Sequence, residues 1–329
     1  MITVTLVATL AAAALWRQWR GVEVEAAERT RVQSVWLLTG ALDWGRLILS
    51  GDYSEDSRKN QMVDHLGEPW AVPLAEARLS TFLAAGEAST DTDRDAFLSG
   101  QVSDLQARLN VMNLVVGNPN ARQEAYLRFE RLFAALGLRA GELALLRDNL
   151  QRADEAMKAS AADASDAPLL PRRFDQLAWL GVSPETLELL RPYLTVLPVE
   201  GGSPTRVNLN TAPAPVLAAV LALNPADAQR LVGEREREFF KNTSDPRLRG
   251  ADTAWASVNS SFFEVRGRLR LDDVALEEVS VVRRSGRHRV STLWRERAAL
   301  SAPSSGERRA ASGERRAASG ERRAASVER

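Results

Sequence analysis

The chain has 329 residues with 43 basic and 43 acidic side chains, so its formal net charge is zero. This balance argues against a dedicated nucleic-acid-binding protein, which needs excess positive charge to neutralise phosphates. The sequence has no cysteine and two histidines, His65 and His288, which excludes thiolate catalysis, zinc–thiolate sites and a multi-histidine metal centre. The composition therefore favours a protein that is not an enzyme.

Residues 1–16 carry no ionisable side chain. A helix of this length spans about 24 Å, a little short of the ~30 Å hydrocarbon core of a bilayer. A cleaved signal peptide is one interpretation, but no basic residue precedes the apolar run and no small-residue cleavage site follows it. Instead, Trp16 and Trp19 stand beside Arg17 and Arg20 as an interfacial collar. We therefore favour an uncleaved membrane helix over a signal peptide.

The same helix is predicted to continue into water as far as residues 49–52, where Gly51 and Asp52 give a C-terminal stop. Side chains at steps of three and four form one stripe: Val24, Ala27, Arg31, Val35, Leu38 and Leu42. A signal anchor followed by an amphipathic helix explains this pattern, and so does a filament-forming helix that packs against copies or partners. The residues expected to face the membrane or a partner are Leu6, Leu10, Leu15, Trp16, Trp19, Val24, Val35, Leu38 and Leu42.

The segment after the helix shows strand patterning twice. Residues 70–74 contain Pro73 and predict a short edge strand, because a central strand does not tolerate proline. Residues 97–114 contain two apolar runs broken at Ser103 and Asp104, which predict two strands joined by a tight connection.

A polar loop before these strands contains Asp91, Asp93 and Asp95, which resemble the start of a calcium loop. Such a loop needs glycine at its sixth position and glutamate at its twelfth. Ala96 and Val102 stand there instead. We therefore interpret the loop as a solvated acidic turn.

Residues 119–237 are predicted to be helical and contain an internal repeat. Residues 136–138 (LGL) return 44 positions later as residues 180–182 (LGV), and an apolar helical run follows each. A glycine, a short loop and an apolar helix describe a helical hairpin that is used twice. Residues 153–167 are rich in Ala, Ser and Asp and predict an exposed loop. The whole segment predicts a compact all-helical subdomain.

Residues 206–221 resemble the entry to a helix–hairpin–helix DNA-binding element, with Thr211 as the expected N-cap. The DNA-binding form holds a phosphate with backbone N–H groups of a glycine-rich hairpin. Here that hairpin contains Pro225, which has no N–H, and nearby carboxylates balance Arg206 and Arg230. A structural hairpin is the favoured interpretation. A membrane-anchored helix–hairpin–helix protein for DNA binding or uptake is the alternative.

The last third of the chain returns to strand patterning. Residues 263–271 alternate apolar and charged side chains, and residues 275–282 and 289–294 predict two further strands of an antiparallel meander. From Ser305 the sequence repeats SGERRAA every seven residues and offers no apolar stripe, so we expect a disordered tail. Neither G-x-S-x-G nor H-E-x-x-H occurs, which argues against a hydrolase.

Taken together, these blocks resemble the K-type minor pseudopilins, also called general secretion pathway protein K, of bacterial type II secretion systems. The resemblance covers roughly residues 1–296. The matching blocks are residues 16–18 (WRQ), 40–49 (GALDWGRLIL), 99–110 (SGQVSDLQARLN), 113–115 (NLV), 207–212 (VNLNTA) and 261–267 (SFFEVRG).

The resemblance implies an α+β, pilin-like fold. A long N-terminal helix would pack on an antiparallel sheet, and a large all-helical domain, SAM-like or helix–hairpin–helix-like, would be inserted between strands. The expected divisions are an N-terminal helix, a first part of the head, the inserted domain, the C-terminal strands of the head and a tail: residues 1–50, 51–117, 118–240, 241–297 and 298–329.

The resemblance also implies a non-enzymatic subunit that caps the tip of the pseudopilus with the I-type and J-type minor pseudopilins and promotes its assembly. Family members have a basic leader that prepilin peptidase removes, and no such leader precedes Met1. Arg17 and Arg20 alone would place the C-terminal side of the membrane helix in the cytoplasm. The family instead implies one pass through the inner membrane, with the globular part in the periplasm.

Some members of this family bind calcium in an acidic segment of the helical region. Asp154, Asp163 and Asp166 lie roughly there, but the acidic, glycine-containing pattern of that segment is absent. We therefore predict no calcium, no other cofactor and no nucleic-acid partner.

Overall fold

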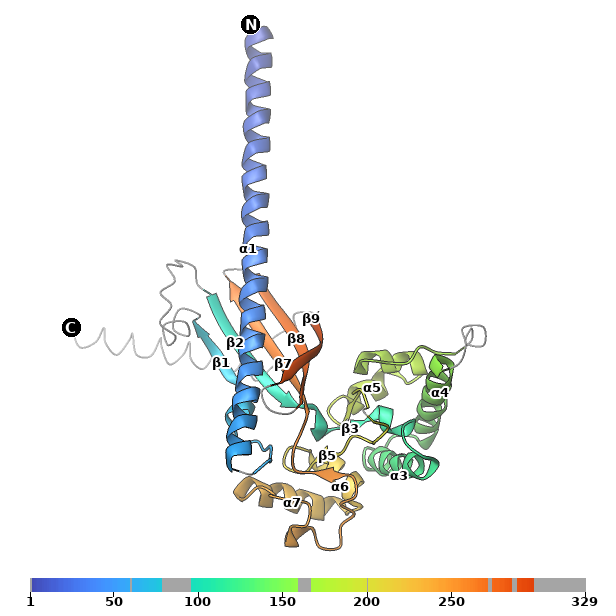
Figure 1. Ribbon diagram of the computed structural model, residues 1–329. Coiled ribbons are helices and arrows are strands. Elements are labelled where there is room, and N and C mark those ends of the chain that lie inside the picture. The colour runs from blue at the N-terminus through green and yellow to red at the C-terminus, as the bar shows by residue number, and fades with distance from the viewer. Residues whose placement is uncertain are drawn as a thin grey trace, which may run out of the picture.

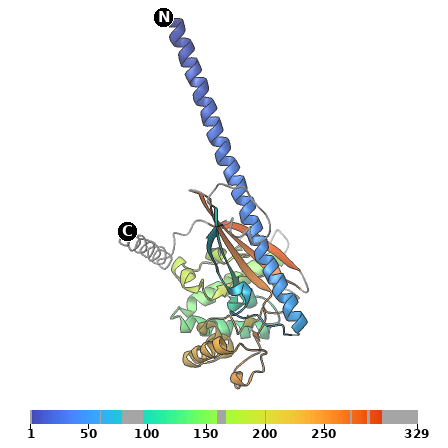
Figure 2. The same cartoon turned by 90° about the vertical axis from the view of Figure 1, so that its left-hand side faces the viewer.

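The computed structural model describes residues 2–59, 61–78, 96–158, 167–199, 201–271, 274–285 and 289–298. A long helix dominates the molecule, a twisted sheet packs along its C-terminal half, and a group of helices lies beyond the sheet at the end away from the N-terminus (Figure 1). The view at right angles shows the sheet beside the helix and the helical group below the sheet, level with the last turns of α1 (Figure 2). The predicted α+β class is confirmed, with an N-terminal helix packed on an antiparallel sheet.

Helix α1 (Ile2–Lys59) is exposed along its first half and buried on one side along its second. All described side chains before Thr30 are exposed. From Ser34 onward, one position in every three or four is buried, the spacing of a single helix face: Ser34, Leu38, Leu42, Gly45 and Leu49.

The structure divides the predicted stripe on α1 and corrects the predicted end of this helix. Burial against the sheet begins only near Ser34, so Val24, Ala27 and Arg31 are exposed, and their place on a membrane or partner surface stays a prediction. Gly51 and Asp52 do not end the helix, which runs on to Lys59. Gly51 lies at a position of α1 with open space around it. It therefore destabilises the helix only through its low helix propensity, by roughly 1 kcal/mol relative to alanine.

The sheet has five antiparallel strands in the order β1 (Leu74–Arg78), β2 (Ala96–Asp104), β7 (Phe262–Leu271), β8 (Val274–Arg284) and β9 (Val290–Ala298). This arrangement confirms the predicted C-terminal meander. Alternate side chains of β7 face α1, and the closest approach is at Gly267, where an added Cβ would lie 3.1 Å from Leu38 Cδ1 and 3.3 Å from Leu42 Cδ2. Glycine at this position lets the helix rest directly on the sheet.

The predicted strands around β1 and β2 need correction. Residues 70–74 do not form a strand, because the chain makes a 3₁₀ turn, η1 (Pro69–Ala71), and enters the sheet only at Leu74, although β1 is an edge strand as expected. Residues 97–114 form two strands joined by a tight turn, as predicted, but only β2 belongs to the five-stranded sheet, and the second strand, of two residues, pairs in the helical region. Asp104 ends β2 because its side chain accepts a hydrogen bond from Gln106 N and turns the chain out of the sheet.

The residues between β2 and β7, 105–261, are called the helical region here. It contains helices α3 (Pro119–Ala135), α4 (Ala140–Lys158), α5 (Pro184–Leu190), α6 (Ala214–Leu221) and α7 (Pro225–Arg237). Short 3₁₀ turns occur at η2 (Leu105–Ala107), η3 (Val111–Leu114), η4 (Phe174–Leu180) and η5 (Pro246–Leu248). Two small parallel pairs join β3 (Leu109–Asn110) to β4 (Leu194–Thr195) and β5 (Val207–Asn208) to β6 (Ala256–Ser257).

The helical region has its own apolar core, separate from the core between α1 and the sheet. Its helices begin at Pro119 and end at Arg237, as predicted. The repeated glycines, Gly137 and Gly181, both adopt left-handed backbone angles, with φ of 68° and 80°, just before α4 and α5. The repeat therefore marks two equivalent turns, as its sequence pattern indicates.

Two local predictions in this region are wrong. Residues 153–158 belong to α4 rather than to a loop, and residues 159–166 lie outside the described part of the chain. Thr211 is not the N-cap of α6, because Pro213 holds that position and the Thr211 hydroxyl bonds to Asp104. The acidic loop at Asp91, His288 and the SGERRAA tail also lie outside the described residues.

Candidate functional site

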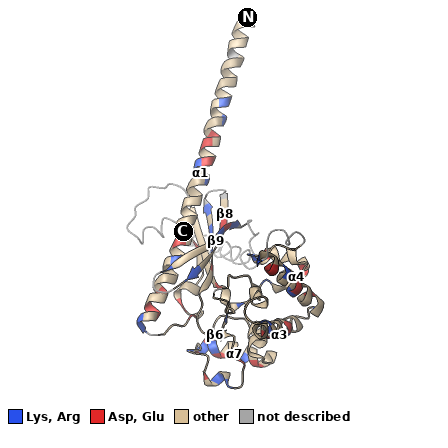
Figure 3. Cartoon of the chain, turned by 45° about the vertical axis from the view of Figure 1, so that its right-hand side comes forward, with Lys and Arg blue, Asp and Glu red and all other residues tan. Residues whose placement is uncertain are grey.

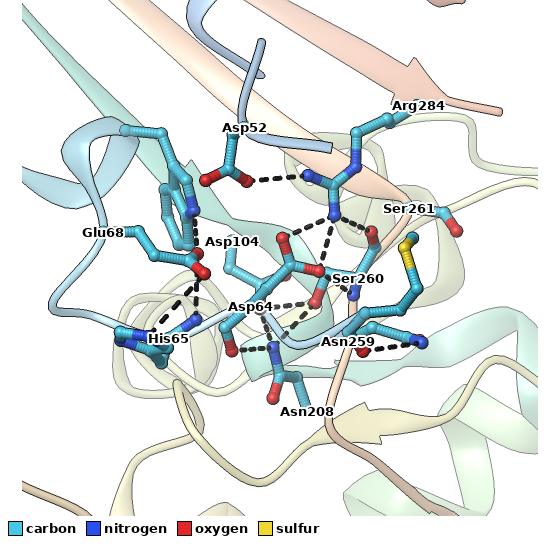
Figure 4. Close-up of polar contacts among 12 residues, drawn as sticks. Asp52, Asp64, His65, Glu68, Asp104, Asn208, Asn259, Ser260, Ser261 and Arg284 are labelled. Atoms are coloured by element: carbon cyan, nitrogen blue, oxygen red, sulfur yellow. Dashed lines mark hydrogen bonds and ion pairs between the residues drawn. The ribbon is translucent and has the colours of Figure 1, made fainter. Parts of the chain in front are cut away.

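A buried group of charged residues lies where α1, the sheet and the helical region meet (Figure 4). It consists of Asp52, Asp64, Glu68, Asp104 and Arg284 and is called the acidic junction below. Asp52 comes from the last turns of α1, and Asp64 and Glu68 come from the segment that follows. Asp104 and Arg284 are the last residues of strands β2 and β8. The members of the junction therefore come from α1, from the segment after α1 and from the sheet.

Asp104 joins the sheet to the helical region. Its carboxylate accepts hydrogen bonds from Gln106 N at 2.7 Å and, at 2.6 Å each, from the hydroxyls of Thr211 and Ser260. Asn208 Nδ2 lies 3.0 Å from the same carboxylate. Such a buried group is stable only because these donors replace the water it has lost.

Arg284 supplies the positive charge of the junction. Its guanidinium lies 3.1 Å from Asp52 Oδ2 and 2.5 Å from both carboxylate oxygens of Asp64, and it also donates to Ser260 O at 3.0 Å. The ring of Phe263 lies 4.9 Å from the centre of this guanidinium. Removing one partner from such a buried ion pair is much more costly than the pair itself is worth.

The carboxyl groups outnumber this one guanidinium, and burial makes their charged forms costly. Burial, followed by the negative charge of Asp64, raises the pKa of Asp52 to about 7. Burial, followed by the charge of Asp52, raises the pKa of Glu68 to about 8. Burial raises the pKa of Asp104 to about 6, although its hydrogen-bond donors oppose the change. The charge of the junction therefore changes near neutral pH.

We assign no metal to the acidic junction. Carboxylate oxygens of Asp52, Asp64 and Glu68 lie within 4.8 Å of one another, a spacing that suits a cation. Arg284 already occupies the position of positive charge, and Glu68 accepts from Trp70 Nε1 at 2.5 Å. Of the residues considered for calcium in the helical region, Asp154 pairs with Lys158 at 2.5 Å. Asp163 and Asp166 lie outside the described residues.

The VNLNTA segment, residues 207–212, holds the helical region together through its asparagines. Asn208 Nδ2 reaches Asp64 O at 3.1 Å as well as Asp104. Asn210 is paired with the backbone of Phe240, donating to its carbonyl at 2.9 Å and accepting from its N–H at 2.7 Å. Both asparagines are buried, so this segment has a structural role in the fold.

The hairpin between α6 and α7 does not resemble a phosphate-binding loop. Its turn places Ala222 at a φ of 54°, Asn224 caps α7 by accepting from Asp227 N at 2.9 Å, and Pro225 begins that helix. Arg230 pairs with Asp227 at 3.3 Å and with Glu234 at 2.8 Å. Among the described residues, no observation favours the DNA-binding alternative.

The residues predicted to face a membrane or partner fall into two groups. Six lie on the exposed half of α1: Leu6, Leu10, Leu15, Trp16, Trp19 and Val24. Leu38 and Leu42 are buried against the sheet, and Val35 is half-buried beside them. The first turns of α1 carry no charged residue, and a band of basic and acidic residues follows (Figure 3).

The structure adds an exposed apolar pair on α1, Trp36 at 73% and Leu47 at 67% exposure. These positions are eleven residues apart, about three helical turns, so they project from the same side of α1. None of the described helices combines the length and apolar character that a membrane crossing requires.

The acidic junction itself was not predicted from the sequence, where Asp52 was interpreted as a helix stop. One local feature of the sequence points to the junction, namely Arg283 and Arg284 at the end of an apolar strand. Two cations at such a position predict acidic partners nearby in the fold. The partners are far away in the sequence, and Asp52 is 232 positions from Arg284.

Comparisons with known proteins agree on one family. Two family models described as type II secretion system protein K match residues 107–199 and 207–261, both within the helical region. Type II secretion system protein K of Pseudomonas aeruginosa is 25% identical over 330 aligned positions, which cover 93% of each chain.

A solved structure has the same fold. It is a chain in the crystal structure of the GspK–GspI–GspJ complex from the type 2 secretion system of enterotoxigenic Escherichia coli. The match has a TM-score of 0.61 with 18% sequence identity, and it covers 83% of the present chain and 99% of the other.

Proposed function

Because the chain belongs to the protein K family of type II secretion systems, we propose that this minor pseudopilin caps the tip of the pseudopilus and promotes its assembly. The capping role is structural and needs no catalytic group. The observation that carries the proposal is the position of the helical region. It leaves the sheet after β2, returns at β7, and lies at the end of the molecule opposite the N-terminus of α1 (Figure 1).

The size of the helical region explains how capping would work. In a filament whose helices run side by side, the next subunit above would have to occupy the space beyond the head. A compact chain of 157 residues, the length of the region between β2 and β7, has a radius of gyration of roughly 15 Å. A body of that size beyond the sheet blocks the position of another subunit, so this chain stays at the tip.

We propose the I-type and J-type minor pseudopilins as its partners in the tip. The solved chain with the same fold belongs to a complex of GspK, GspI and GspJ, which supports this choice. On the present chain, the exposed side of α1 that carries Trp36 and Leu47 is the surface we assign to partner helices, because burying large apolar side chains stabilises an interface.

We also propose that the first half of α1 anchors the protein in the inner membrane by a single pass, with the globular part in the periplasm. The support is the uncharged N-terminal run and the collar that follows it, where Trp16 and Trp19 have ring centroids 5.6 Å apart and Arg20 lies 6.0 Å from the Trp16 ring. Prepilin peptidase is a partner only if a leader precedes the present sequence.

Partner assembly gives a direct test. The full chain in detergent is mixed with the I-type and J-type pseudopilins of the same system, and the mass of the complex is measured by light scattering. We expect Trp36→Glu combined with Leu47→Glu to prevent assembly, because both charges would be buried at the interface. The control is Leu66→Glu, which places a charge at another exposed apolar position, outside α1. Assembly that survives both α1 changes would rule out this side of the helix as the partner surface.

A further inference from the structure

A cavity of about 400 Å³ lies between the sheet and the helical region, and none of its lining residues belongs to the acidic junction. Its floor is the face of β7, β8 and β9 that points away from α1, and its wall is formed by η4 and the end of α5. Val279, Val281, Phe174 and Trp294 make part of this lining apolar. A concave site with an apolar floor and a few charged groups is the usual form of a binding site.

The charged part of the lining is mainly basic, with five arginines against three carboxylates. Three of the arginines are already neutralised by ion pairs. Arg173 pairs with Glu296, Arg191 pairs with Asp175 at 2.9 Å, and Arg266 lies 3.1 Å from Glu264 and 2.7 Å from Glu277. A fourth, Arg297, is exposed at the rim and is hydrated by solvent.

Arg108 differs from the other arginines of the cavity. It is partly buried, and no carboxylate among the described residues lies within ion-pair distance of its guanidinium. Burial lowers the pKa of Arg108, although the negative charges of Glu264 and Asp104 oppose the change, and the positive charges of Arg266 and Arg191 add to the lowering. A partly buried cation that forms no ion pair with a described residue has lost part of its hydration without a close opposite charge, so an anion at this point would stabilise the folded chain.

The neighbouring strand suggests what kind of molecule brings that anion. Strand β9 pairs only with β8 among the described strands, and on its backbone Val290 O accepts from the Arg46 side chain of α1. The part of β9 that lines the cavity, Trp294 to Arg297, has no second described strand beside it. Val281 pairs with Trp294 and Val282 with Thr292, which leaves Leu293 as an extra residue, a bulge in the edge strand. Open edges accept extended peptides, and bulges are common beside binding sites.

We propose that this cavity binds a carboxylate side chain of an extended acidic peptide segment from another protein, with Arg108 as its principal ligand. The planar guanidinium matches a carboxylate with two parallel hydrogen bonds, and the apolar floor accepts the neighbouring side chains of the segment. The tail of this chain is a poor occupant because it contains seven arginines and four glutamates and is itself basic. This assignment goes beyond tip capping and does not depend on it.

The test uses the full chain in detergent and two blocked pentapeptides with a fluorescent label, acetyl-TVEVT-amide and its glutamine analogue acetyl-TVQVT-amide. Fluorescence anisotropy measures the dissociation constant of each. We expect the glutamate peptide to bind at least about tenfold more tightly, and Arg108→Gln to remove that preference. Arg297→Gln is the control, because it removes an exposed cation at the rim of the same cavity that is not the proposed carboxylate ligand.

Melting temperatures show whether Arg108 has only a structural role. Since Arg108 is partly buried and forms no ion pair within 4.0 Å with a described residue, Arg108→Gln should melt at the same temperature as the parent chain or higher. A clear drop in melting temperature, or equal binding of the two peptides, would overturn the proposal. Inorganic phosphate and acetate are also compared as competitors of the bound glutamate peptide. If phosphate displaces the peptide at a lower concentration than acetate does, the cavity binds a phosphate group and the proposal is overturned.

Discussion

Single residues of the acidic junction hold α1, the sheet and the helical region together. Asp104 is bonded to Thr211 and Ser260, which are 107 and 156 positions away in the sequence, and Arg284 reaches back to Asp52. These contacts fix how the helical region is attached to the sheet. The proposed cap therefore depends on a small number of buried polar groups.

The junction predicts how stability depends on pH. Asp52, Glu68 and Asp104 have folded-state pKa values of about 7, about 8 and about 6, above the ordinary values of 3.8 for aspartate and 4.5 for glutamate. The folded chain therefore binds more protons than the unfolded chain between about pH 4 and pH 8, so these groups lower the free energy of unfolding as pH rises through that window. We expect a higher urea midpoint at pH 5.5 than at pH 8.5.

The variant Asp52→Asn isolates the contribution of one group. The amide is neutral at every pH in this range, and Asp64 still pairs with Arg284. The variant should lose part of the difference between the two midpoints, while Asp227→Asn, at an exposed position on α7, should keep all of it. A parent chain that becomes more stable on going from pH 5.5 to pH 8.5, with an Asp52→Asn variant that behaves identically, would contradict this account.

At the scale of elements, α1 divides into an exposed half and a half that is buried on one side. The change occurs within a continuous helix, because only the residues from Ser34 onward have the sheet beside them. Within that half, Leu42 is 1% exposed and Leu47 is 67% exposed. One helix thus carries both a packing face for its own sheet and a free face.

These two leucines give a matched pair of variants. Leu42→Asp places a charge against Gly267 and the surrounding apolar side chains, where its desolvation costs several kcal/mol. We expect this variant to lose cooperative melting, as followed by circular dichroism, while Leu47→Asp melts like the parent chain. If both variants melt at the parent temperature, the packing face of α1 is assigned to the wrong side.

Local signals in the sequence were enough to predict several elements. The alternation in residues 263–271 predicted β7, and Pro119 at the start of α3 marked the beginning of the helical region because proline suits the first helical turn. The end of α1 and the role of Thr211 were predicted wrongly. Thr211 bonds to Asp104, 107 positions away, and Asp52, expected to end α1, is paired with Arg284, 232 positions away, and local spacing reveals neither contact.

At the scale of the whole molecule, the chain is a head built on α1 with a second body placed beyond it (Figures 1 and 2). The chain leaves the head at the end of β2 and returns to it at the start of β7. These two points are adjacent, because β2 and β7 are neighbouring antiparallel strands and Asp104 lies opposite Phe263. The second body is therefore attached where a short hairpin would otherwise join the strands. This topology makes it removable without breaking the sheet.

Removing that body tests the capping proposal most directly. Residues 108–259 are replaced by a Gly/Ser linker of about four residues, a usual length for a hairpin connection. Gln106 and Ser261 remain, and their hydrogen bond at 2.6 Å closes the end of the sheet. Labelled parent and shortened chains are then assembled with the other pseudopilins and located by electron microscopy. We predict that the parent chain labels one end of the pseudopilus and that the shortened chain, still cooperatively folded, labels positions along the shaft. Labelling by the shortened chain at one end only would show that bulk does not restrict this subunit to the tip.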